Sequence, residues 1–100
     1  MDRPIGVNTW VWQSPLTDAL LPQLLAKIAG MGFDAVELPL ENPGDFTAGT
    51  ARDALAATGL EPYLVGAMAP GRDLVLADAG SVQATQDYLA ACIDLAHALG

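Results

Sequence analysis

The stretch that decides the fold is one in which a helical pattern ends and a strand begins: Ile28-Ala29-Gly30-Met31-Gly32-Phe33-Asp34-Ala35-Val36-Glu37-Leu38. Upstream of it, apolar residues recur at helical spacing from Leu16 to Met31, which predicts one buried helix face. Gly30 and Gly32 can adopt the left-handed conformation that ends a helix. The short apolar run that follows, 35–39, is typical of a strand. The stretch is therefore a helix-to-strand connection.

The same order of residue types occurs a second time. Gly59-Leu60-Glu61-Pro62 again gives a glycine, an apolar residue, an acidic residue and the start of a strand, which we place at 62–67. Thr50 and Asp53 have the spacing of a capping box, which predicts a helix over 50–59. The helix-to-strand unit is thus repeated.

Two further elements complete the pattern. An apolar, β-branched run at 4–9 predicts a first strand. Asp18 is the expected N-cap of the first helix; the alternative is a start near Leu21 with Pro22 at the first helical position. A longer last helix is predicted from an apolar face made of Val82, Thr85, Leu89, Cys92, Ala96 and Leu99.

Strands that alternate with helices imply a parallel sheet, either a small doubly wound sheet or the opening part of a (β/α)8 barrel. Side-chain parity favours the barrel. Asn8 and Glu37 alternate with apolar neighbours, so they fall on the face opposite to the helices, near the carboxyl ends of their strands. No glycine-rich nucleotide motif follows the first strand. We therefore expect an α/β fold in which residues 1–100 form the first three βα units of a single, incomplete TIM-barrel domain.

Composition narrows the partners. Twelve acidic against four basic residues give a net charge of −8, and the basic residues are scattered, which argues against nucleic acid as a partner. A hydrophobic content of 52% excludes disorder. No apolar run approaches the ~18 residues that span a membrane, and the N-terminus lacks the features of a signal peptide. The single cysteine, Cys92, favours a reducing, cytoplasmic setting and is expected to be an inert core thiol.

Three segments carry a family resemblance: Ile5-Gly6-Val7-Asn8-Thr9-Trp10, the stretch from Ile28 to Leu38, and Gly66-Ala67-Met68 followed by Arg72-Asp73-Leu74. They resemble the xylose-isomerase-like barrel superfamily and, more narrowly, the sugar phosphate isomerases and epimerases that include D-tagatose and D-allulose 3-epimerases. The resemblance implies a ketose 3-epimerase in which a divalent ion (Mn or Mg, with Co as a further option) holds the substrate. Two glutamates would then exchange the C3 proton through an enediolate.

In this family the metal and catalytic residues come from the fourth strand onward. No residue of 1–100 is therefore assigned a catalytic or metal-binding role. The resemblance places Asn8, Trp12, Glu37 and Val65 at positions that shape the substrate pocket. Position in the predicted fold adds two residues of the loop after the third strand. Met68 can line the pocket, and the Arg72 guanidinium can clamp a phosphate or carboxylate.

Several residues also have a purely structural interpretation. Glu37 can pair with a basic residue of the barrel floor. Arg72 can form a surface pair with Asp73 or Asp78. One of Trp10 and Trp12 can serve as an aromatic platform for a sugar face, and the alternative is that they pack within their loop. Met31 is expected in the core, and His97 is expected to be exposed at the end of the last helix.

Other functions remain open on the same evidence. An inosose dehydratase or a hydroxypyruvate isomerase would use the same barrel, whereas the charge of −8 argues against a DNA-repair enzyme of the endonuclease IV type. A non-catalytic fragment or interaction module is the alternative from another class. For the complete enzyme we expect a small sugar or sugar phosphate as substrate, a homo-oligomeric assembly and no membrane partner.

Overall fold

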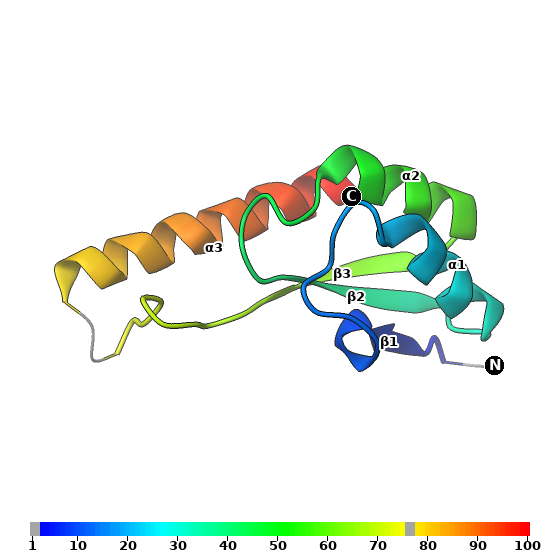
Figure 1. The fold of residues 1–100 in the computed structure, drawn as a ribbon, viewed down its shortest axis with the longest axis horizontal. Coiled ribbons are helices and arrows are strands. Elements are labelled where there is room, and N and C mark those ends of the chain that lie inside the picture. The colour runs from blue at the N-terminus through cyan, green and yellow to red at the C-terminus, as the bar shows by residue number, and fades with distance from the viewer. Residues whose placement is uncertain (1–2, 76–77) are drawn as a thin grey trace.

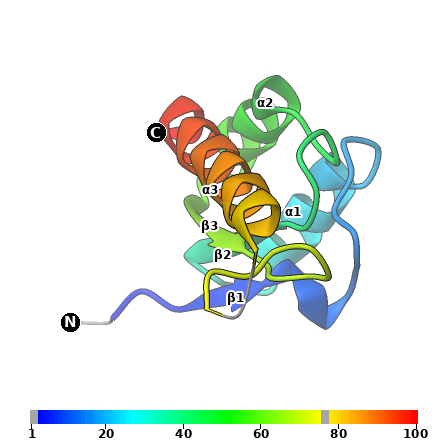
Figure 2. The same ribbon diagram turned by 90° about the vertical axis from the view of Figure 1, so that its left-hand side faces the viewer.

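The computed structural model describes residues 3–75 and 78–100. Along the chain it contains strand β1 (Gly6–Asn8), a short 3-10 helix η1 (Thr9–Val11), helix α1 (Leu21–Gly30), strand β2 (Ala35–Leu40), helix α2 (Ala48–Thr58), strand β3 (Glu61–Gly66) and helix α3 (Ala79–Leu99). The α-helices gather on one side of the sheet, and α3, the longest of them, lies roughly parallel to the long axis of the molecule (Figures 1 and 2).

The described strands form a parallel sheet in the order β1-β2-β3. Asn8 lies opposite Glu37, and Glu37 lies opposite Tyr63, so these three residues form one row across the sheet. Parallel pairing follows from the crossover helices, each of which returns the chain to the same end of the sheet. The predicted alternation of strands and helices is confirmed.

The core lies between the sheet and the helices. Val36 and Leu38 of β2 are fully buried and pack into one cluster with apolar side chains of all three α-helices: Leu21, Leu25, Ile28, Ala51, Leu55, Tyr88 and Cys92. On the opposite face, Glu37 is exposed and Tyr63 keeps 53% of its surface in solvent. In a closed barrel, this second face would turn to the interior and the first would pack under the helices.

The starts of α1 and α2 differ from the predictions. Leu20, not Asp18, is the N-cap of α1, so the helix begins at Leu21 with Pro22 in its first turn, as in the alternative. Helix α2 begins at Ala48 after the N-cap Thr47, so the predicted capping box that began at Thr50 is wrong. The Asp18 carboxylate instead accepts hydrogen bonds from the Thr47 N–H at 2.7 Å and from its hydroxyl at 3.0 Å. A distant acceptor thus holds the residue that begins α2.

Smaller corrections concern single residues. Gly30 is the last residue of α1, while Gly32, with φ of 95°, takes the left-handed conformation. Met31, expected in the core, is 52% exposed because it follows the last helical turn. On α3 Ala96 is exposed, and Tyr88, which the apolar pattern had left out, is buried.

Cys92 is buried in the core, as expected. Within residues 3–75 and 78–100, no helix is both long and apolar enough to cross a membrane.

Candidate functional site

The segments that follow β1, β2 and β3 all leave the sheet at its carboxyl edge, because the strands are parallel. At the end of β1, the Asn8 side-chain oxygen accepts the Trp10 backbone N–H at 2.8 Å. Asn8 therefore caps the 3-10 turn that begins the first loop. Active sites of parallel α/β barrels form at this edge, so these loops form the candidate functional site.

Glu41 follows directly after β2 and reaches the first loop. Its carboxylate oxygen Oε2 accepts from the Trp10 indole Nε1 at 3.2 Å and from the Ser14 hydroxyl at 2.6 Å. Hydrogen bonds to a carboxylate are stronger than those between neutral groups. One side chain from the second loop thus fixes two residues of the first.

Arg72 joins the third loop to the second. Its Nη1 donates to the main-chain carbonyls of Glu41 at 2.5 Å and Ala67 at 3.0 Å, and its Nη2 donates to the Asn42 side chain at 2.9 Å. The guanidinium carbon also lies 3.7 Å from the centre of the Tyr88 ring. Arg72 uses both the rigid donor fork and the flat face of its guanidinium, which a lysine cannot reproduce.

Tyr88 on α3 supports the same edge from the helix side. Its hydroxyl donates to the Leu40 carbonyl at 2.5 Å and accepts the Ala67 N–H at 2.6 Å, which links the ends of β2 and β3. Burial raises the pKa of the Tyr88 phenol above its ordinary value. The phenol therefore stays protonated and keeps its donated hydrogen bond at neutral pH.

The row Asn8–Glu37–Tyr63 lies below this edge on the open face of the sheet. Glu37 and Tyr63 line a hollow of about 320 Å³ together with Pro4, Gly6 and Ala35. The Glu61 carboxylate, whose negative charge opposes ionisation, raises the pKa of the Tyr63 phenol. The open face thus offers an amide, a carboxylate and a neutral phenol, all groups that can bind hydroxyls.

No family model matches the chain. The chain is 30% identical over 96 residues to a ketose 3-epimerase of Arthrobacter globiformis, an alignment that covers 96% of the chain and 33% of the relative. A crystal structure of D-allulose 3-epimerase from Methylomonas sp. superposes with a TM-score of 0.89 at 25% identity, over 97% of the chain and 34% of that protein. The same enzyme in complex with D-allulose gives 0.88 at 23% identity over the same shares.

The chain is thus similar in sequence to a ketose 3-epimerase and in fold to a D-allulose 3-epimerase. It spans about a third of the length of the relatives to which it is similar. The fold is that of the first three βα units of a (β/α)8 barrel, as the sequence predicted. In such a barrel the open face of the sheet turns inward, and the carboxyl edge lies at its mouth.

On this fold, five of the predicted substrate-binding residues lie on the strands or in the loop after β3. Asn8 and Glu37 are neighbours on the inward face. Val65 is half-buried on β3 opposite Pro39, and Met68, with 58% of its surface exposed, lies in the loop after β3. Arg72 is at the barrel mouth, where the hydrogen bonds described above engage its guanidinium. Contact between these five residues and a substrate remains a prediction.

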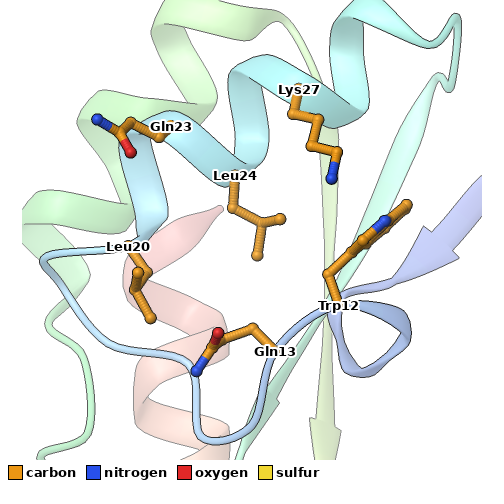
Figure 3. Close-up of a pocket in the computed structure, with 6 residues that line it drawn as sticks. All are labelled: Trp12, Gln13, Leu20, Gln23, Leu24 and Lys27. Carbon is orange, nitrogen blue, oxygen red and sulfur yellow. The ribbon is translucent and has the colours of Figure 1, made fainter.

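Trp12 is separate from this group. Its ring turns toward α1, with the Lys27 ammonium 5.4 Å from the ring centre (Figure 3). The two side chains line a pocket together with Gln13, Leu20, Gln23 and Leu24, between the first loop and α1.

The residues of 3–75 and 78–100 do not fit a metal ion. No group of three or more His, Cys, Asp or Glu side chains in this part of the chain is arranged to hold one. The metal that the resemblance implies would therefore need ligands from other strands of a complete barrel.

Sequence reasoning missed the residues that hold the mouth together: Ser14, Glu41, Asn42 and Tyr88. The sequence position of Glu41 was a partial indication, because a carboxylate that closely follows a predicted strand lies at the carboxyl edge of the sheet. Tyr88 carried none, since its partners are main-chain groups of Leu40 and Ala67.

Proposed function

We propose that the protein to which this chain belongs is a sugar epimerase of the ketose 3-epimerase type, and that residues 1–100 form one wall of its barrel. One observation carries the proposal: the chain combines 30% identity to a ketose 3-epimerase with a TM-score of 0.89 to a D-allulose 3-epimerase. Under this proposal the substrate is a ketose, free or phosphorylated. The enzyme works in the cytoplasm, as a homo-oligomer.

Epimerisation at C3 removes the proton beside the C2 carbonyl and returns one to the other face of the carbon. A divalent ion such as Mn, Mg or Co would stabilise the negative charge that develops on the oxygens at C2 and C3 of the sugar. Because the described residues do not fit such an ion, the metal ligands and proton-transfer groups belong to other strands in this proposal.

The role of this chain is to bind and orient the sugar. The Glu37 carboxylate can accept hydrogen bonds from sugar hydroxyls, and Tyr63 and the Asn8 amide stand beside it in the same row. Val65 and Met68 offer apolar surface above the row. Orientation of this kind keeps the C3 hydrogen in line with the group that removes it.

The proposal is tested with the full-length protein and D-allulose in deuterated water. We expect conversion to the C3 epimer, D-fructose, with deuterium at C3 and at no other carbon, measured by NMR. Sugars with and without a terminal phosphate decide the substrate form, and an inosose and hydroxypyruvate serve as alternative substrates. Turnover of either of these two with no ketose epimerisation would overturn the proposal. Absence of any turnover would support a non-catalytic module.

The Glu37→Gln variant tests the binding role. We expect kcat/KM for the ketose to fall by about tenfold or more while the urea midpoint changes little, because an exposed carboxylate contributes little to folding. Asp94→Asn makes the same charge change at an exposed position of α3, away from the open face of the sheet, and should leave kcat/KM near wild type. Equal losses in the two variants would contradict a specific role for Glu37.

A further inference from the structure

We infer that Glu41 is a positioning residue that holds the Trp10 indole as an aromatic wall of the ketose site. The inference rests on the proposed function and deepens it. The sequence singled out no role for Glu41 and left open which of Trp10 and Trp12 could pack against a sugar. Together, Glu41 and Trp10 identify which of the two tryptophans faces the sugar.

The first argument is geometric. Trp10 follows β1 and Glu41 follows β2, so the hydrogen bond between Nε1 and Oε2, at 3.2 Å, spans the mouth from one strand end to the next. Only the nitrogen edge of the indole is used in this bond. The side chain keeps 42% of its surface exposed, so ring surface is available to a ligand. Aromatic rings bind the apolar C–H faces of sugars in this way.

The second argument is that the loop is fixed at several points. The Asn8 side chain holds the Trp10 backbone N–H, and Glu41 holds both the indole and the Ser14 hydroxyl. The Glu41 carbonyl in turn accepts from Arg72, which is anchored on the third loop. A ring held by its backbone, its nitrogen and its neighbour is pre-organised, so little conformational entropy is lost when a sugar binds.

The third argument is the contrast with Trp12. Its ring lies beside the Lys27 ammonium on the flank of α1 and packs against the core (Figure 3). That ring is already engaged on the helix side. The two tryptophans therefore have different roles. Trp12 packs the first loop against α1, and Trp10 lies partly exposed at the barrel mouth.

The experiment compares variants of the full-length protein. Glu41→Gln keeps a carbonyl oxygen that can accept both bonds, whereas Glu41→Leu removes the acceptor at similar volume. We expect Glu41→Leu to raise KM for the ketose about fivefold with kcat within about twofold, as for the loss of one or two hydrogen bonds, and Glu41→Gln to restore KM. Trp10→Phe should raise KM similarly, and adding Glu41→Leu to it should have little further effect.

A second readout does not depend on activity. The indole N–H signal that disappears in Trp10→Phe is thereby assigned to Trp10 in the NMR spectrum. It should move and exchange faster with water in Glu41→Leu but not in Glu41→Gln. If the position and the exchange rate of that signal are the same as in wild type in both Glu41 variants, the positioning role is overturned.

The remaining outcomes separate the two proposals. An active wild type whose KM is unchanged in Glu41→Leu and Trp10→Phe would overturn the aromatic wall and leave the epimerase proposal standing. A wild type that epimerises no ketose would overturn the proposed function and the wall together. The Glu41–Trp10 contact would then still stand or fall on the indole signal.

Discussion

The hydroxyl of Tyr88 donates a hydrogen bond to the main-chain carbonyl of Leu40, a residue 48 positions earlier in the chain. The same hydroxyl accepts the Ala67 N–H, so one phenol on α3 satisfies a group at the end of β2 and another at the end of β3. Buried main-chain groups that lose their partner are costly. The stability of the sheet edge therefore depends on this side chain.

Tyr88→Phe is expected to reduce the free energy of unfolding by about 1–3 kcal/mol, because a donor and an acceptor of the main chain are left without their partner. Urea unfolding followed by circular dichroism measures the change. Tyr63→Phe is the matched control, since that side chain is 53% exposed and the same atom is removed. A similar loss in both variants would contradict the role given to the Tyr88 hydroxyl.

Asp18→Ala is expected to destabilise the protein by about 1–2 kcal/mol, because Thr47 loses both hydrogen bonds that fix the start of α2. The measurement is again the urea midpoint. Asp53→Ala serves as the control, because it removes a carboxylate from the same helix, α2. Asp53 belonged to the predicted capping box, which the structure does not contain. We expect that variant to stay within about 0.5 kcal/mol of wild type.

Arg72→Lys should loosen the third loop, although the charge is retained, because an ammonium cannot match the bonds to Glu41, Ala67 and Asn42. Trypsin cleaves after both residue types, so its rate at position 72 reports access to the loop. We expect cleavage about five- to tenfold faster than in wild type, as for the loss of one strong hydrogen bond. Arg52→Lys on the exposed side of α2 corrects for the preference of the protease.

Asp78 gives a prediction about pH. The Ser81 N–H donates to its carboxylate at 2.8 Å and lowers the pKa of Asp78 from the ordinary 3.8. Because the folded pKa lies below the unfolded one, this contribution to stability is present above pH 3.8 and is lost as the pH falls through the folded pKa. Asp78→Asn keeps an acceptor but does not titrate. Its stability should fall less steeply than that of wild type over this acid range; parallel curves would contradict the prediction.

The elements of the fold could be predicted from local patterns, and the contacts between the loops could not. Helical spacing and the glycine-to-strand connections located β2, β3 and the α-helices, because burial on one face imposes a period that sequence displays. Helix starts were harder to predict. Thr50 and Asp53 had the right spacing for a capping box, yet Asp18, far away in sequence, binds Thr47 and helps to fix the start of α2.

The candidate site shows the same division. Asn8 and Glu37 could be placed together, since strand parity and parallel register are properties of the sheet. Arg72 was correctly placed in the third loop, but its partners are the Glu41 carbonyl and the Asn42 side chain of the second loop and the Ala67 carbonyl of its own. Main-chain carbonyls are the same at every position, so no residue pattern marks the ones that a guanidinium will meet.

Gly6 has a consequence for how a site on this sheet can change. A Cβ added to it would lie 3.0 Å from the Cβ of Ala35, its neighbour at the amino end of β2, so alanine at this position would require Ala35 to shift by a few tenths of an ångström. A larger side chain at either position would therefore disturb the packing of both strands. Laboratory evolution toward a larger or smaller sugar should therefore accumulate substitutions in the loops at the barrel mouth and leave Gly6 and Ala35 unchanged.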